Sequence, residues 1–188
     1  MTVVGAVLSG GMSKRMGQNK ADVLVRDQTM LEMVGTTMKS VLDTVVLLGP
    51  DRDGWECWPD AVHAHGPLAG IATALARTDA EHIFLLAVDH PFARAGTIER
   101  IVDKRGELPV VPVDAHGARQ VTCALYPRVV ADAAAEEAAN GGSVQSLLDR
   151  VSFTAITPET WESWGEDGRS WYSVDSPEAL TEGLGLFT

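Results

Sequence analysis

Short apolar runs alternate with helical patterns along the first half of the chain, and this alternation is what most limits its fold. The runs cover residues 3–8, 44–48 and 83–88, and their few polar residues are typical of strands buried on both faces. Between them, apolar residues recur at helical spacing: Leu31, Val34, Met38 and Val41, then Leu68, Ile71 and Leu75. This order predicts a doubly wound α/β sheet, mostly parallel, with helices on both faces.

The second half of the chain carries weaker signals of the same kind. Strands are predicted at 109–113, 121–126 and 171–174, and helices at 130–139 and 143–151. Ser176, Pro177 and Glu178 match the start of a last helix, with an N-cap, a first-turn proline and an acidic residue. No linker-like stretch divides the sequence, so we expect one domain over residues 1–188.

Charge and cysteine content exclude several classes of protein. The net charge of −11 argues against a nucleic-acid partner, which would need a basic face. Cys57 and Cys123 lie far apart, so neither a disulfide scaffold nor a zinc cluster is expected. The opening apolar run is too short for a signal peptide, and no segment approaches a membrane span. We expect a cytoplasmic protein with no membrane partner.

The scarce basic residues gather in one glycine-rich loop, which contains Gly10, Gly11, Lys14, Arg15 and Lys20. The spacing matches neither the Walker A loop nor the dinucleotide-binding loop. Adjacent glycines let backbone N–H groups approach a phosphate, the arginine can clamp phosphate oxygens, and the last lysine adds a movable charge. The loop therefore predicts a triphosphate site. The alternative is an ordinary turn with solvated charges.

Two carboxylates are predicted at the ends of strands. Asp89 follows the run 83–88 directly, and ligands of open α/β sheets bind beyond the carboxyl ends of the strands. An aspartate there suits Mg²⁺, a hard cation that prefers oxygen ligands, although it could simply begin a turn. Asp175 follows the strand predicted at 171–174, and it could bind the metal or cap the last helix.

A glycine-bounded turn at 66–70 opens the helix that follows the second strand. Gly66 and Gly70 could keep this turn slim, so that a flat ring lies against backbone amides. The alternative is ordinary punctuation, because proline is common at the first position of a helix.

Five motifs in a fixed order resemble those of the nucleotidyltransferase family that makes the dinucleotide form of the molybdenum cofactor. They are L-A-G-G-x-x-x-R-M-G-x-x-K at 8–20, G-P-L-A-G at 66–70, D-x-P at 89–91, Q-P-L-x-A-L-Y at 120–126 and N-x-N-[ST]-P at 173–177. The chain departs from these patterns with Ser9 for alanine, Val121 for proline, and Ser173 and Asp175 for asparagines.

The resemblance implies molybdenum cofactor guanylyltransferase activity on a single Rossmann-like α/β domain, a three-layer sandwich of the nucleotide-diphospho-sugar transferase type. GMP would pass from Mg²⁺-GTP to the terminal phosphate of molybdopterin, with pyrophosphate released. Protein partners would be other cofactor-biosynthesis proteins or acceptor molybdoenzymes. The resemblance also assigns roles. The nucleotide would contact Leu8, Ser9, Gly10, Gly11, Lys20, Asp60, Gly66, Pro67, Leu68 and Asp89; Asp89 and Asp175 would bind Mg²⁺; Arg119 and Gln120 would face the pterin; and Arg15, Lys20 and Asp89 would be catalytic.

Other functions stay open at this point. A related enzyme could use CTP on the same pterin, or a different anionic acceptor such as a sugar phosphate. A non-catalytic GTP-binding module could keep the loop for regulation. An oxidoreductase that binds a nicotinamide dinucleotide is a weaker alternative, because the dinucleotide fingerprint is absent.

Overall fold

A seven-stranded sheet forms the centre of the computed structural model, which describes residues 2–9, 12–13, 18–59 and 66–187. Its middle strand, β1 (Val3–Leu8), pairs with β6 (Thr44–Leu48) and β8 (His82–Ala87), both parallel to it. The order across the sheet is β11-β9-β10-β8-β1-β6-β7. The outer strands are β7 (Cys57–Trp58), β9 (Val110–Pro112), β10 (Cys123–Pro127) and β11 (Thr154–Ile156). Only β10 runs antiparallel to its neighbours among these seven strands.

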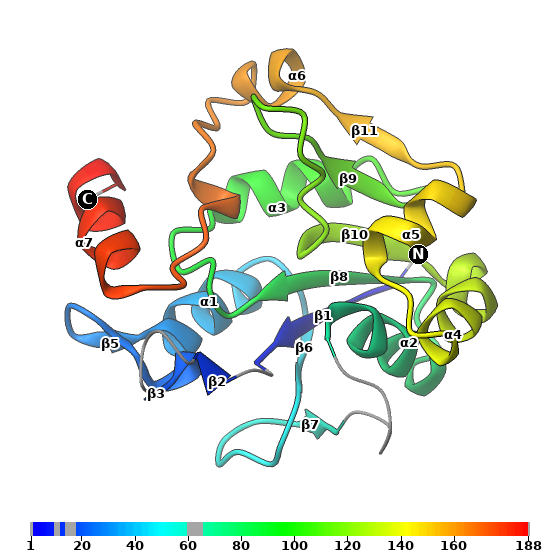
Figure 1. Ribbon diagram of the computed structural model, residues 1–188, viewed down its shortest axis with the longest axis horizontal. Helices are drawn as coiled ribbons and strands as arrows, with labels where there is room; N and C mark the ends of the chain where they lie inside the picture. The colour runs from blue at the N-terminus through cyan, green and yellow to red at the C-terminus, as the bar shows by residue number, and fades with distance from the viewer. Residues whose placement is uncertain (1, 10–11, 14–17, 60–65, 188) are drawn as a thin grey trace.

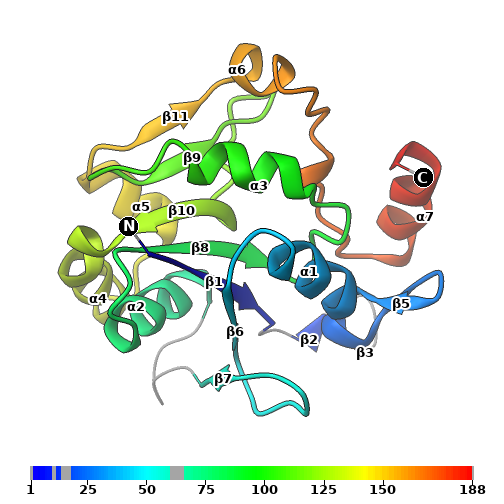
Figure 2. The ribbon, with the colours of Figure 1, turned by 180° about the vertical axis from the view of Figure 1, so that it is seen from behind.

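Helices cover both faces of this sheet, so the predicted three-layer α/β fold is confirmed (Figures 1 and 2). One layer contains α1 (Met30–Lys39) and α3 (Ala95–Val102), and the opposite layer contains α2 (Pro67–Arg77), α4 (Ala131–Ala139) and α5 (Val144–Arg150). Successive side chains of a strand point to opposite faces. Val7 accordingly packs in the core with Met30 of α1, whereas Ala6 packs with Ile71 of α2.

Short elements complete the two ends of the chain. Near the N-terminus, β2 (Met12–Ser13) pairs with β3 (Gln18–Asn19), the 3₁₀ turn η1 (Lys20–Asp22) follows, and β4 (Leu24–Val25) pairs with β5 (Gln28–Thr29). The remaining elements are η2 (Arg128–Val130), α6 (Pro158–Glu162), η3 (Arg169–Trp171) and α7 (Pro177–Phe187). Across the described ranges, no helix is both long and apolar enough to cross a bilayer.

The start of the last helix is confirmed in atomic detail. The α7 helix begins at Pro177, and the Ser176 hydroxyl accepts a hydrogen bond from the Ala179 amide at 3.2 Å. Ser176 is therefore the N-cap, and its side chain satisfies an amide that the helix leaves without an internal partner.

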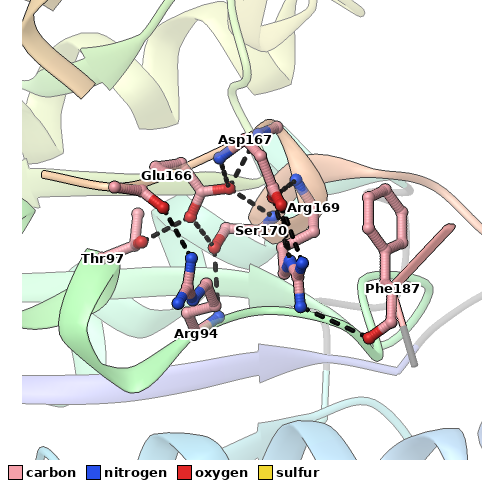
Figure 3. Close-up of polar contacts among 9 residues, drawn as sticks. Arg94, Thr97, Glu166, Asp167, Arg169, Ser170 and Phe187 are labelled. Atoms are coloured by element: carbon pink, nitrogen blue, oxygen red, sulfur yellow. Dashed lines mark hydrogen bonds and ion pairs between the residues drawn. The ribbon is translucent and has the colours of Figure 1, made fainter. Parts of the chain in front are cut away.

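The strand predicted at 171–174 is wrong, because the Trp171 and Tyr172 amides donate to the Gly168 and Arg169 carbonyls and the Val174 amide donates to the Asp89 carbonyl. The segment directly before it folds around a buried carboxylate. Glu166 is only 4% exposed, and its Oε1 accepts hydrogen bonds from the amides of Asp167, Gly168 and Ser170 at 3.0, 2.8 and 3.3 Å. These amides lie in residues 167–170, directly before the predicted strand. The chain instead forms η3, and Figure 3 shows the side chains gathered around Glu166.

Candidate active site

A lysine and an aspartate meet at the carboxyl ends of the central strands. Lys20 lies in η1, beyond the end of β1, and Asp89 lies two residues beyond β8. The Lys20 Nζ atom is 2.7 Å from Asp89 Oδ2, and both side chains are 20% exposed. In Figure 1 the arrowheads of β1 and β8 point toward the end of the sheet where β2 and β3 lie. Two residues predicted for phosphate and metal binding are therefore in direct contact.

The C-terminal segment supplies further contacts to Asp89. The Ser173 hydroxyl donates to Asp89 Oδ2 at 3.2 Å, and the Val174 amide donates to the Asp89 carbonyl at 2.8 Å. Burial of Asp89 opposes its ionisation, but attraction to His90 when that ring is protonated, the contact with Lys20 and the Ser173 hydrogen bond together outweigh burial, so the pKa of Asp89 is lowered. The aspartate is a carboxylate at neutral pH.

His90 is buried beside this carboxylate and is 3% exposed. Its Nδ1 lies 3.3 Å from the Tyr172 carbonyl oxygen, and its Nε2 lies 2.9 Å from Thr122 Oγ1. Burial lowers the pKa of His90 more than attraction to Asp89 raises it, so the ring is neutral at neutral pH. The positive charge that faces Asp89 under these conditions is therefore that of Lys20.

A pocket of about 520 Å³ opens on the β6 side of Lys20 and Asp89. Its lining residues are Ser9, Asn19, Asp22, Leu47, Pro50, Asp51, Arg52 and Asp53. The Ser9 hydroxyl donates to the Leu48 carbonyl at 3.1 Å, and Arg52 forms an ion pair with Asp22 across the pocket lining. Ser9 was predicted to contact a nucleotide, but the prediction did not include Asp51, Arg52 and Asp53, which line the same pocket. These charged residues follow the apolar strand β6, and that position could have identified them, because ligands of open α/β sheets bind beyond the carboxyl ends of the strands.

The turn at 66–70 has two different uses for its glycines. Gly66 has a φ of +89° and caps α2, a conformation that glycine adopts without strain. A Cβ on Gly70 would lie 3.0 Å from Leu8 and 3.2 Å from Leu48, so this glycine lets α2 pack closely on the sheet. The expectation that Gly70 makes room for a ring is therefore wrong. Leu68 is 3% exposed, so its side chain belongs to the core.

The two residues predicted to face the pterin already have partners within the chain. The Arg119 Nη2 atom donates to Asp149 Oδ1 at 2.7 Å, and the Gln120 side-chain amide donates to Asp114 Oδ2 at 2.9 Å. Gln120 lies two residues before Thr122, which contacts His90. An acceptor that binds Arg119 or Gln120 has to share or replace these interactions.

Six other predicted residues divide into two groups. Gly10, Gly11, Lys14, Arg15 and Asp60 lie outside the described residues. Asp175 is described, but it does not follow a strand, because the chain from 172 to 176 has no regular structure. The contact with the Asp89 carboxylate comes from Ser173, two residues earlier. In the ranges that the structure describes, no three His, Cys, Asp or Glu side chains gather as a metal site.

A second set of contacts holds the segment 165–170 against the start of α3 (Figure 3). The Arg94 amide donates to Ser170 Oγ at 3.0 Å, and Arg94 Nη1 donates to the Gly165 carbonyl at 2.6 Å. Glu166 Oε2 accepts from Thr97 Oγ1 and Ser170 Oγ, each at 2.5 Å. These contacts hold residues 165–170 in place, just before the chain reaches Tyr172 and Ser173 at the site.

Comparison with known proteins places this chain in a family. The family model of the MobA-like NTP transferase domain matches residues 5–154. The molybdenum cofactor guanylyltransferase of Desulfosudis oleivorans is 27% identical over 186 residues, which cover 95% of this chain and 92% of that protein.

Two solved structures share the fold. Molybdopterin-guanine dinucleotide biosynthesis protein A from Archaeoglobus fulgidus has a TM-score of 0.85 at 21% identity, with 97% of each chain covered. A manganese complex of a Mycobacterium tuberculosis protein has a TM-score of 0.72 at 21% identity, covering 98% of this chain and 99% of that one. Since the family model spans most of the sequence, the chain belongs to the MobA-like NTP transferase family and is a nucleotidyltransferase.

Proposed function

We propose that this enzyme transfers GMP from GTP to the terminal phosphate of molybdopterin. The observation that carries the proposal is the contact between Lys20 and Asp89, which unites a cation for phosphate oxygens with a carboxylate for a metal ion. A relative that covers nearly the whole chain is named molybdenum cofactor guanylyltransferase, which supports the choice of nucleotide and acceptor.

In the proposed reaction, one phosphate displaces another. An oxygen of the molybdopterin phosphate forms a bond to the α-phosphorus of GTP, and the bond from that phosphorus to the β-phosphate oxygen breaks, which releases pyrophosphate. A phosphate nucleophile is already ionised near neutral pH, so no general base is required. The enzyme has to bring two anions together and neutralise the charge of the leaving group. Lys20 would move its ammonium group from Asp89 to the phosphate oxygens. We propose that Arg15 also neutralises the charge of the leaving pyrophosphate.

Divalent metal chemistry fits the oxygen donors at the site. The Asp89 carboxylate is ionised, partly exposed and next to the Ser173 hydroxyl, and such oxygens are typical magnesium ligands. We propose that Asp89 binds Mg²⁺, with Asp175 as a second ligand from the segment that carries Ser173. Held by these residues, such an ion would supply positive charge that offsets the charge of the phosphate oxygens. The manganese complex of the Mycobacterium tuberculosis relative supports a divalent cation of this class.

The nucleotide would lie between the glycine-rich loop and the pocket beside β6. We propose Leu8, Ser9, Gly10 and Gly11 as its first contacts, and the start of α2 at Gly66, Pro67 and Leu68 as a further wall made of backbone. Asp60 is a candidate contact by its position before this turn. Arg119 and Gln120 would face the pterin, since Gln120 lies close in sequence to the strand that borders Asp89.

Pyrophosphate release with molybdopterin as acceptor tests the reaction. We expect release with GTP and little with CTP, and we expect a metal chelator to abolish it. Lys20→Ala and Asp89→Ala should each abolish transfer while the circular dichroism spectrum and the melting temperature show a folded protein. Lys104→Ala and Asp103→Ala are matched controls at the end of α3, and both should keep wild-type rates.

Each alternative function predicts a different result. Faster release with CTP would identify a cytidylyltransferase, and release that needs a sugar phosphate would identify another acceptor. Binding of GTP with no release under any condition would support a non-catalytic module. Wild-type rates in Lys20→Ala or Asp89→Ala would refute the assigned site, whatever the substrate.

A further inference from the structure

The ammonium group of Lys20 contacts the same carboxylate that we assign to a metal ion. Its Nζ lies 2.7 Å from Asp89 Oδ2, which also accepts a hydrogen bond from the Ser173 hydroxyl at 3.2 Å. Both side chains of the ion pair are only 20% exposed, so solvent and salt screen the two charges incompletely. A divalent cation that binds Asp89 therefore meets a positive charge already in contact with that carboxylate.

The acidic residue that lies closest to Lys20 in the sequence is paired with a different cation. Asp22 belongs to the same turn, η1, but it forms an ion pair with Arg52 from the loop after β6. Asp22 thus has a positive partner of its own, and the charge of Lys20 is directed at Asp89, from a distant part of the chain.

The ammonium group can leave Asp89 while both backbones stay in place. Asn19 Oδ1 accepts a hydrogen bond from the Ala21 amide at 3.0 Å, which holds the turn that carries Lys20. The Asp89 carbonyl accepts from the Val174 amide at 2.8 Å, which holds the other partner. A lysine side chain, by contrast, has a flexible four-carbon stem. Release of the carboxylate therefore needs only a new rotamer of the lysine.

A triphosphate attracts this ammonium group more strongly than one carboxylate does. The pocket beside β6 is lined by Asn19 and Asp22, each within two residues of Lys20, so a nucleotide bound there has its phosphates close to the lysine. A triphosphate carries several negative charges and Asp89 carries one, so the Coulomb energy favours transfer of the ammonium group to the phosphates. The carboxylate of Asp89 then has one cation fewer and attracts a divalent cation more strongly.

We propose that Lys20 makes divalent-cation binding at Asp89 depend on the nucleotide, because its ammonium group competes for the carboxylate until a triphosphate draws it away. The inference rests on the proposed function, in which Lys20 binds phosphate and Asp89 binds the cation, and it adds the coupling between the two events. Such coupling is reciprocal, so the cation strengthens nucleotide binding by the same factor. In an enzyme without nucleotide, the ion pair weakens the affinity of Asp89 for a cation.

Titration with Mn²⁺ in the absence of nucleotide, followed by calorimetry, measures this competition. Lys20→Met removes the ammonium group and should bind Mn²⁺ on the order of tenfold more tightly than the wild type. Lys20→Arg keeps the charge and should bind Mn²⁺ as weakly as the wild type. Lys104→Met, which removes a lysine just beyond α3, is the matched control for net charge. Equal Mn²⁺ affinity in Lys20→Met and Lys104→Met would overturn the proposal.

Titration with GTP in the presence of EDTA tests the same competition from the side of the nucleotide. Asp89→Asn should bind GTP on the order of tenfold more tightly than the wild type, because Lys20 no longer has to leave a carboxylate. In the Lys20→Met background the same substitution should bring little gain, and this double-mutant cycle isolates the contribution of the pair. Equal gains in the two backgrounds would show that Asp89 merely repels the triphosphate, and the proposal would fail.

The Mn²⁺ titrations also separate this inference from the proposed function. If Asp89→Asn leaves the Mn²⁺ affinity of both the wild type and Lys20→Met unchanged, the metal site of the proposed function is refuted, and the competition is refuted with it. If Asp89→Asn abolishes Mn²⁺ binding but Lys20→Met binds Mn²⁺ no more tightly than the wild type, the competition alone is refuted and the proposed function stands.

Discussion

Replacing Glu166 measures how strongly one buried carboxylate organises the C-terminal segment. The carboxylate accepts five hydrogen bonds, three from backbone amides on Oε1 and two from hydroxyl groups on Oε2 (Figure 3). In Glu166→Gln the amide oxygen can keep the backbone bonds, and the new NH₂ group can donate to Thr97 and Ser170 once their hydroxyls rotate. The number of bonds is kept, but their charge assistance is lost.

The expected cost follows from this difference. Hydrogen bonds to charged groups are stronger by about 1 kcal/mol each than neutral ones, but burying a charge offsets much of that advantage. We therefore expect Glu166→Gln to lower the free energy of unfolding by about 2 kcal/mol, which corresponds to a melting temperature lower by about 4–8 °C in a chain of this size. Glu166→Ala leaves the buried amides without an acceptor and should cost at least about 4 kcal/mol.

Urea and thermal unfolding, followed by circular dichroism, are the assays. Asp167→Asn is a matched control, because Asp167 lies next in the chain but pairs with Arg169 at the surface, where such pairs contribute about 1 kcal/mol at most. If Glu166→Gln is no less stable than Asp167→Asn, the carboxylate does not organise the segment. If Glu166→Gln is as damaging as Glu166→Ala, the reasoning about retained bonds is wrong.

Three further predictions concern the periphery of the fold. Gly183→Ala should destabilise the protein by roughly 1–3 kcal/mol, because the new Cβ would lie 2.5 Å from Phe92. Thermal unfolding measures this, and a stability equal to that of the wild type would show that α7 shifts freely. Arg26→Gly should stabilise the protein by about 0.5 kcal/mol, because Arg26 has a φ of 58°, in the left-handed region that glycine adopts without strain. A lower free energy of unfolding in urea would contradict this. Burial and a hydrogen bond to Glu182 raise the pKa of Tyr172 to about 12 from 10.0. The folded protein thus keeps a proton that the unfolded chain loses, so stability should be complete below pH 10.0 and fall toward pH 12. Tyr172→Phe should flatten this alkaline loss in urea midpoints, and an unchanged pH profile would refute the assignment.

The centre of the fold could be predicted from sequence because its signals are local. The strands at β1 and β6 coincide with their apolar runs, and α2 coincides with its helical spacing. By contrast, β11 was missed, since two of its three residues are exposed and it shows no apolar run. The strand expected at 171–174 failed because the Trp171 and Tyr172 amides close the η3 turn and the Val174 amide donates to the carbonyl of Asp89, a residue far away in the sequence.

The candidate site divides in the same way. Lys20 and Asp89 could be found because each lies at a fixed position after an apolar strand, within a recognisable motif. Ser173, Thr122 and His90 could not be placed together by local pattern. Their contacts join residues that are 84, 82 and 32 positions apart, and only the folded chain brings them into one place.

The contact between Ser173 and Asp89 has a consequence for fragments of this chain. Asp89 and Lys20 belong to the part of the chain that the family model covers, whereas Ser173 lies beyond its end at residue 154. A chain cut at this boundary keeps both charged residues, but it loses β11 after Thr154 and the Ser173 hydroxyl that donates to Asp89 Oδ2. A fragment limited to residues 5–154 therefore has the Lys20–Asp89 pair without the hydrogen bond that the C-terminal segment adds to the carboxylate.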